Sequence, residues 1–226
     1  MLDGNSLVEF LKERGFSTLC HVNTAATALT FLRNGGLLSR QYVKEHPETC
    51  FQTSQDSDQI DQNFGIFNDI FFDAEDIWDH GGMKYCYYGP ITFYYNVEIL
   101  SEFSNIYVSR ENPLYWKKGC FSDNCFIDIN ELKNKIQSSM YAWPIAHHII
   151  MHDQGVLNFG NSLRRVLFWG PDNNISGCYK DYIVNMCNTF AGLCNDMGID
   201  FDYKIMKSYK WNQIVDECKI YKFYYI

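Results

Sequence analysis

The chain has 226 residues, of which 46% are hydrophobic and 17% aromatic, and its formal net charge is −8. This length fits one domain, and the aromatic content predicts a large core with many strands. No apolar run reaches the roughly 18 to 20 residues of a transmembrane helix, and the acidic, amphipathic start MLDGNSLVEF is unlike a signal peptide. We therefore expect a single domain over residues 1–226, without membrane contact.

Cysteine usage and charge bear on location and partners. Nine cysteines without a repeating spacing favour reduced thiols in a cytoplasmic protein over a disulfide framework. The negative charge repels nucleic acid at long range, so contact with nucleic acid requires a local basic patch. The same charge also fits a protein or small-molecule substrate, a basic inhibitor, or solubility alone.

Residues 19–40, LCHVNTAATALTFLRNGGLLSR, are the most informative stretch. A β-prone run over residues 17–22 predicts a strand that ends near His21. Asn23 or Thr24 is expected to cap a helix, because either side-chain oxygen can accept from a free N–H of the first turn. A Gly-Gly pair then ends the helix. The apolar face of this helix is expected to comprise Ala25, Ala28, Leu29 and Leu32.

The rest of the first half is less regular. A capping box at residues 6–9 predicts a helix that buries Leu7, Phe10 and Leu11. A polar loop is expected at about residues 45–63. The type of element over residues 65–79 stays open, and its acids are expected to form a solvated face. These acids are Asp69, Asp73, Glu75, Asp76 and Asp79.

The second half predicts more regular elements. Strands are expected over residues 91–100, 105–109, 145–151, 164–169, 203–206 and 219–226. Helices are expected over residues 129–140, 180–196 and 210–218, and a loop over residues 155–160.

The strand-end histidine, the capped helix and the following Gly-Leu-Leu-Ser-Arg resemble the opening motif of the ADP-ribosyltransferase fold, in particular DarT-like toxins that modify nucleic acid. YGPITFYY at residues 88–95 and the closing strand, W-x-x-I helix and edge strand are similar to later parts of that family. The resemblance implies an α+β fold with a mostly antiparallel, split β-sheet flanked by helices.

The resemblance also implies NAD+ as substrate and a set of site residues. The strand-end His holds the ribose, and an aromatic residue of the 88–95 segment lines the nicotinamide pocket. On chemical grounds, a cation such as Arg40 can pair with the pyrophosphate bidentately. Tyr94 and Tyr95 point to opposite faces of their strand, so one can lie in the site. Residues expected to bind NAD+ are His21, Asn23, Thr24, Arg40 and Tyr94. Candidate catalytic residues are Tyr95, Asp202 and Glu217.

More than one residue could supply the catalytic carboxylate. In the family a Glu sits at the head of the penultimate strand, whereas here Asp200 or Asp202 takes that place. Because Asp is one methylene shorter, Glu217, just before the last strand, competes with them, and Glu111 is a third candidate.

Other chemistries fit less well. His148 and His152, with Asp153, Cys120 and Cys125, could form a zinc site, but no C-x2-C spacing supports one, and no metal is expected. No cysteine lies in a recognisable nucleophile motif, and no Rossmann or P-loop glycine motif is present.

The sequence thus predicts an NAD+-dependent mono-ADP-ribosyltransferase, a toxin or antiphage effector acting on RNA or single-stranded DNA and restrained by an antitoxin. A protein-modifying enzyme and a non-catalytic module that binds NAD+ or nucleic acid are the alternatives. The candidate nucleic-acid surface combines interleaved tyrosines with Arg164, Arg165 and the lysines at positions 204, 207, 210, 219 and 222.

Overall fold

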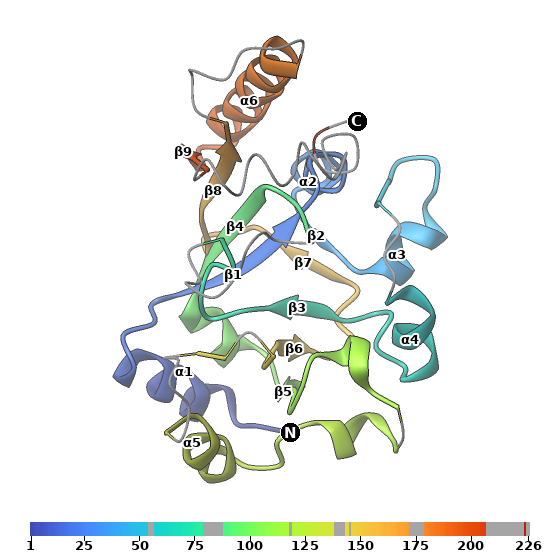
Figure 1. Ribbon diagram of the computed structural model, residues 1–226, viewed down its shortest axis with the longest axis vertical. Coiled ribbons are helices and arrows are strands. Elements are labelled where there is room, and N and C mark those ends of the chain that lie inside the picture. The colour runs from blue at the N-terminus through green and yellow to red at the C-terminus, as the bar shows by residue number, and fades with distance from the viewer. Residues whose placement is uncertain are drawn as a thin grey trace.

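A computed structural model describes residues 1–53, 57–78, 88–117, 119–137, 143–144, 146–171, 179–206 and 224. A four-stranded sheet has the order β1-β4-β8-β9, a three-stranded sheet the order β3-β6-β5, and β2 pairs with β7 (Figure 1). All pairs are antiparallel except β8 with β9. The strands are β1 (Thr18–Asn23), β2 (Gly36–Leu38), β3 (Ile70–Phe72), β4 (Ile91–Asn96), β5 (Ile106–Val108), β6 (Ile149–Met151), β7 (Val156–Asn158), β8 (Leu163–Gly170) and β9 (Asp200–Ile205).

Helices surround the sheets on several sides. In Figure 1, α1 and α5 lie below the three-stranded sheet, α3 and α4 lie beside β3, and α6 projects beyond β8 and β9. The helices are α1 (Gly4–Glu13), α2 (Ala25–Asn34), α3 (Arg40–Glu45), α4 (Asp58–Asn63), α5 (Ile129–Gln137) and α6 (Tyr179–Asp196), with 3-10 turns η1 (Val97–Glu102), η2 (Pro113–Tyr115) and η3 (Phe121–Asn124). The expected α+β fold with a mostly antiparallel, split sheet is confirmed. Within the described part of the chain, no helix is both long and apolar enough to cross a bilayer.

The two larger sheets meet at β1 and β3. Cys20 and Asp73 exchange two backbone hydrogen bonds, of 2.8 and 2.9 Å, and form an isolated antiparallel bridge. The three-stranded sheet is thereby attached to the free edge of the four-stranded one. His21, the next residue of β1, lies at this junction.

The local predictions around β1 are confirmed. β1 spans Thr18–Asn23, and Thr24 caps α2, with its hydroxyl accepting from Thr27 N. α2 ends at Gly35, whose φ of +68° is a left-handed conformation that glycine adopts without a Cβ penalty. α2 is buried along nearly its whole length, so it packs as a core helix rather than a surface one.

Several expected boundaries are wrong for identifiable reasons. The first helix is capped by Asp3, which accepts from the backbone N–H and hydroxyl of Ser6, so the box at residues 6–9 lies inside the helix. The strand expected over residues 91–100 ends at Asn96, because the next apolar residues pack against α1 as the turn η1. The polar stretch at residues 45–63 contains α4, and residues 156–158 pair with β2 as a strand.

The acidic face expected over residues 65–79 is also wrong. Asp69 and Asp76 are only 3% and 5% exposed, and both accept hydrogen bonds from neighbouring elements. Sequence spacing could not show this, because their partners lie in β8 and in the turn after β6. The elements expected over residues 210–218 and 219–226 lie outside the described residues, apart from the buried Tyr224.

Gly89 provides a test of how tightly the end of β1 is packed. Its φ is +134°, and an added Cβ would lie 2.4 Å from the Asn23 carbonyl group and Thr24 N. We expect Gly89→Ala to lower the free energy of unfolding by about 3 kcal/mol, measured by urea denaturation. Gly160→Ala is the matched control, because its φ is +48° and nothing lies within 4 Å, so it should cost only about 1 kcal/mol. Equal losses in the two variants would contradict this packing.

Candidate active site

The His21 side chain lies between β1 and β3. Its Nδ1 is 2.7 Å from the carbonyl oxygen of Phe71, and its Nε2 is 2.6 Å from the side-chain nitrogen of Asn23. Because a carbonyl oxygen can only accept, Nδ1 carries the proton and Nε2 accepts from the Asn23 amide. Burial lowers the pKa of His21, so a neutral imidazole is the form expected at pH 7.

The surroundings of His21 are aromatic on two sides. The rings of Phe31 and Phe72 lie 5.7 and 5.8 Å from the imidazole centroid. The structure therefore brings His21, Asn23 and Thr24 together at the end of β1, as the sequence predicts. In the state seen, both ring nitrogens have protein partners, so a ribose would reach His21 by replacing the Asn23 contact or would bind to the Asn23 amide itself.

Tyr94 and Tyr95 lie on opposite faces of β4, but neither is exposed. Tyr95 is fully buried, its ring is 5.4 Å from that of Phe72, and its hydroxyl has no hydrogen-bond partner among the residues that the structure describes. Tyr94 donates from its hydroxyl to the Asp76 carboxylate on the other face. The expectation that one tyrosine lines an open site is therefore not met by the packing of these two side chains.

A buried polar cluster surrounds Tyr94. Asp76 accepts from Tyr94 and from Trp169 Nε1 at 3.3 Å, and also from the Trp78 backbone N–H at 3.0 Å. The Arg165 guanidinium lies 4.3 Å from the Tyr94 ring centroid. Burial, reinforced by the Asp76 charge, raises the pKa of Tyr94, so the phenol stays protonated. The sequence analysis missed Asp76, since its neighbours suggest only an exposed acidic run.

The candidate catalytic acids occupy scattered positions. Asp202 lies on β9, at the far edge of the four-stranded sheet from β1, and its half-exposed carboxylate pairs with Arg165 at 3.2 Å. Asp200 lies on the same edge strand, opposite Arg165 in register. Glu111 is exposed on a surface loop, and Glu217 lies outside the described residues.

The carboxylate that acts electrostatically on His21 is Asp73, which the sequence analysis did not single out. It follows β3, opposite Cys20, and its charge opposes the burial effect on the His21 pKa. Its Oδ1 lies 2.9 Å from Nδ1 of His148, as an ion pair rather than an aligned hydrogen bond. Burial acts to lower the pKa of His148, but the charge and close contact of Asp73, together with the charge of Asp61, outweigh it and the pKa is raised.

The histidines considered as zinc ligands are instead paired with carboxylates. His148 contacts Asp73, and His152 contacts Asp69 through Nδ1 at 2.9 Å. Phe121 stacks on the His152 ring with centroids 4.4 Å apart. Among the described residues, no group of three or more His, Cys, Asp or Glu side chains could hold a metal ion.

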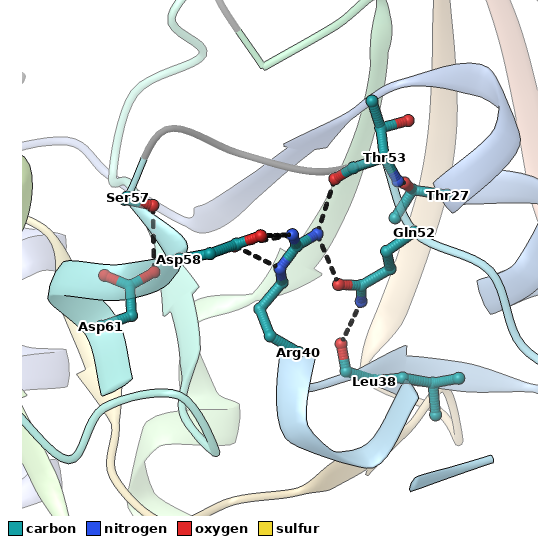
Figure 2. Close-up of polar contacts among 8 residues, drawn as sticks. All are labelled: Thr27, Leu38, Arg40, Gln52, Thr53, Ser57, Asp58 and Asp61. Carbon is teal, nitrogen blue, oxygen red and sulfur yellow. Dashed lines mark hydrogen bonds and ion pairs between the residues drawn. The ribbon is translucent and has the colours of Figure 1, made fainter. Parts of the chain in front are cut away.

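Arg40 and Thr24 both contact Thr53. The Thr24 hydroxyl lies 2.7 Å from that of Thr53, and Arg40 Nη1 donates to the Thr53 carbonyl oxygen at 2.7 Å. Arg40 also donates to both oxygens of Asp58 and to Gln52 Oε1 (Figure 2). The structure thus brings two predicted NAD+-binding residues to one segment, although the guanidinium is already occupied.

A cleft of about 430 Å³ lies between α3 and the end of α4. Its lining comprises Gln41, Lys44, Glu45, Gln62, Gly65 and Phe67. The Lys44 ammonium lies 5.8 Å from the Phe67 ring centroid. None of the residues predicted to bind NAD+ lines this cleft.

Comparisons with known proteins identify the fold. No protein-family model matches the chain, and no curated protein matches it. The structure of Thermus sp. 2.9 DarT in complex with ADP-ribosylated ssDNA matches with a TM-score of 0.50 and 8% sequence identity, over 84% of this chain and 95% of that chain. The chain has a DarT-like ADP-ribosyltransferase fold.

Two further structures of the same Thermus protein align less closely. DarT in complex with NAD+ gives a TM-score of 0.48 at 9% identity, over 84% of this chain and 96% of that chain. DarT in complex with carba-NAD+ gives 0.42 at 11% identity, over 86% and 97%. The fold assignment rests on the first of the three structures, and at 8% identity it extends to the fold alone.

Asp61 on α4 offers a test of the electrostatics of this region. Burial raises the pKa of Asp61 from 3.8 to about 6, so the folded chain holds this proton to a higher pH than the unfolded chain. As the pH rises from 4 to 6, the titration of Asp61 therefore lowers the free energy of unfolding, because its charged form is disfavoured by burial in the folded chain. We expect Asp61→Asn to be more stable than the wild type at pH 7, by about 2 kcal/mol, and equally stable near pH 4.

Urea denaturation of both proteins between pH 4 and 7 measures this difference. The asparagine oxygen can still accept from the Ser57 hydroxyl, which lies 3.0 Å from the Asp61 carboxylate. Subtracting the two curves removes the contributions of other acids. Parallel curves over the whole pH range would show that Asp61 titrates normally.

Proposed function

We propose that the chain is an NAD+-dependent mono-ADP-ribosyltransferase that modifies nucleic acid. The observation that carries the proposal is the placement of His21, Asn23 and Thr24 at the end of β1, before a capped helix, within a DarT-like fold. DarT from Thermus sp. 2.9 was crystallised with ADP-ribosylated ssDNA, which makes single-stranded DNA the first acceptor to test and RNA the second.

ADP-ribosyl transfer requires little covalent chemistry from the protein itself. The bond between the ribose C1′ and the nicotinamide nitrogen breaks, nicotinamide leaves with the electron pair, and an oxocarbenium-like ribose is attacked by the acceptor. The acceptor atom gives its proton to a base as the new bond forms. The protein must therefore hold the ribose, place the acceptor, and supply a carboxylate that stabilises the positive charge.

Residue roles follow from the geometry. His21 and Asn23 provide a neutral imidazole and an amide that can hydrogen-bond ribose hydroxyls, and Thr24 begins α2. Helix amino ends attract phosphate, so the start of α2 suits the pyrophosphate. For the carboxylate, Asp202 and Glu217 remain candidates from the sequence, and the structure adds Asp73.

A non-catalytic module that binds NAD+ or nucleic acid is the second candidate. It is favoured by the burial of Tyr95 and by the position of Asp202, which pairs with Arg165 on β9, at the opposite edge of the sheet from His21. Neither side chain is therefore available beside His21. A protein-modifying transferase is a further alternative that the same assay tests.

We further propose a biological setting. A toxin or antiphage effector that modifies nucleic acid would be restrained by an antitoxin protein, and the charge of −8 favours a basic inhibitor surface. The free thiols of the described cysteines support a reducing compartment, the cytoplasm.

The direct test is incubation with labelled NAD+ and separate pools of single-stranded DNA, RNA and protein. We expect label transfer to nucleic acid. We expect His21→Ala to weaken NAD+ binding about 10-fold or more, because a buried polar partner is lost. Expression of the wild type should also slow bacterial growth, and His21→Ala should relieve that toxicity.

Matched controls make the assay decisive. His46→Ala should retain transfer, because the His46 ring stacks on Tyr42 at the end of α3 and its Nδ1 lies 2.8 Å from the Tyr42 carbonyl oxygen, within the same turn of chain. Circular dichroism and thermal unfolding establish that both variants fold. NAD+ binding without transfer would favour the module, transfer to protein alone would favour a protein-modifying enzyme, and absence of NAD+ binding would refute the proposal.

A further inference from the structure

We infer that Arg40 is a positioning residue that fixes residues 51–53, here called the strap, across the amino end of α2. The strap then forms one wall of the NAD+ site. This inference rests on the proposed function, and it differs from direct pairing of Arg40 with the pyrophosphate.

A row of threonines on α2 holds one side of the strap. Thr24, Thr27 and Thr30 are three residues apart, so they share one face of the helix. The Thr30 hydroxyl accepts from the Phe51 backbone N–H at 3.2 Å, and the Thr27 hydroxyl accepts from the Thr53 N–H at 3.1 Å. The Thr24 hydroxyl lies 2.7 Å from the Thr53 hydroxyl. The strap therefore runs along α2 and ends at the residue that caps it.

Arg40 holds the other side of the strap. Its Nη1 donates to Gln52 Oε1 at 2.9 Å and to the Thr53 carbonyl oxygen at 2.7 Å (Figure 2). The Gln52 amide in turn donates to the Leu38 carbonyl oxygen at 2.9 Å. The strap is thus fixed between α2, the end of β2 and the start of α3.

Asp58 accounts for the remaining donors of Arg40. Arg40 Nε and Nη2 donate to the Asp58 carboxylate at distances of 2.5 to 2.9 Å. An arginine has five N–H donors, and all five have acceptors here. The Arg40 and Asp58 side chains are only 16% and 28% exposed, so the pair is shielded from solvent. A phosphate could bind this guanidinium only by displacing one of these acceptors.

The position of the strap explains why fixing it would matter for NAD+. The Thr24 cap, the adjacent Asn23 and the first free N–H groups of α2 form the part of the site expected to meet the pyrophosphate and ribose. Thr53 touches this cap directly. A loosened strap would widen the site and weaken NAD+ binding without removing a group that touches the reacting atoms.

Asp58→Asn separates positioning from direct contact, because the two accounts predict opposite signs. If Arg40 positions the strap, the loss of the charged fork loosens it, and NAD+ affinity falls by about 10-fold. If Asp58 merely occupies Arg40 until the pyrophosphate arrives, the variant frees the guanidinium, and NAD+ affinity stays the same or rises. The latter result overturns the inference.

Gln52→Ala provides the second variant. It removes one acceptor of Arg40 and the strap's hydrogen bond to the Leu38 carbonyl oxygen, but it leaves Arg40 in place. If Arg40 positions the strap, we expect both Arg40→Ala and Gln52→Ala to raise KM for NAD+, the former by about 10-fold or more, with kcat within about 3-fold of wild type. A direct pyrophosphate contact predicts instead that Gln52→Ala leaves KM for NAD+ unchanged or lower, which would overturn the inference.

Hydrogen exchange gives a readout that does not need NAD+. The amide hydrogens of Phe51 and Thr53 should exchange at least 10-fold faster in Asp58→Asn than in the wild type. Lys12→Ala is the matched control, because it removes a surface ion pair with Glu98 of 2.7 Å and should change neither exchange nor NAD+ binding. Unchanged exchange in Asp58→Asn would overturn the inference.

The two proposals fail in different ways. A wild-type chain that binds no NAD+ overturns the proposed function and the role of the strap in that site. The exchange rates of Phe51 and Thr53 then still decide whether Arg40 fixes the strap. A chain that binds NAD+ but whose affinity ignores Asp58→Asn keeps the proposed function and loses this inference.

Discussion

The pairing of β1 with β3 through Cys20 and Asp73 is the contact on which the candidate site depends. Two backbone hydrogen bonds join the sheets there, and the His21 ring adds a third link to the Phe71 carbonyl group. An unpaired backbone group costs most where water is excluded, so this short bridge fixes the junction firmly. Asn23 and Thr24, the cap of α2, follow within three residues of His21, so the bridge also fixes their positions.

Buried or partly buried acids recur around the junction, and each is paired with side chains of other elements. Asp69 is paired with His152, Asp73 with His148, and Asp76 with Tyr94 and Trp169. A buried carboxylate without partners would be strongly destabilising. The partners of these three acids come from several different elements. The acids therefore tie β3 and its flanking residues to β6 and β8 at defined positions. This arrangement uses part of the negative charge for internal structure rather than for solubility.

Sequence reasoning succeeded where the signal is local. Neighbouring residues determine the strand that carries His21, the Thr24 cap, the buried face of α2 and its glycine end. The fold class was instead predicted from the resemblance of the motif at residues 19–40 to a known family. It failed where distant segments decide the outcome. Residues 156–158 form strand β7 because they pair with β2. Asp69 and Asp76 have hydrogen-bond partners, His152 and Trp169, that lie more than 80 positions away in the sequence. Arg40 was recognised as important, but its partners Gln52, Thr53 and Asp58 gave no pattern that spacing could reveal.

The pairing of β1 with β4 also has a consequence for synthesis. Thr18 pairs with Asn96, so more than 70 further residues must be synthesised before the backbone groups of β1 can form hydrogen bonds with β4. At ribosomal rates of roughly 5 to 20 residues per second, that delay is about 4 to 15 s. β9 is added later still, beside β8. A nascent chain thus contains the strand that carries His21 well before the strands that pair with it, so the region around His21 can assemble only late in synthesis.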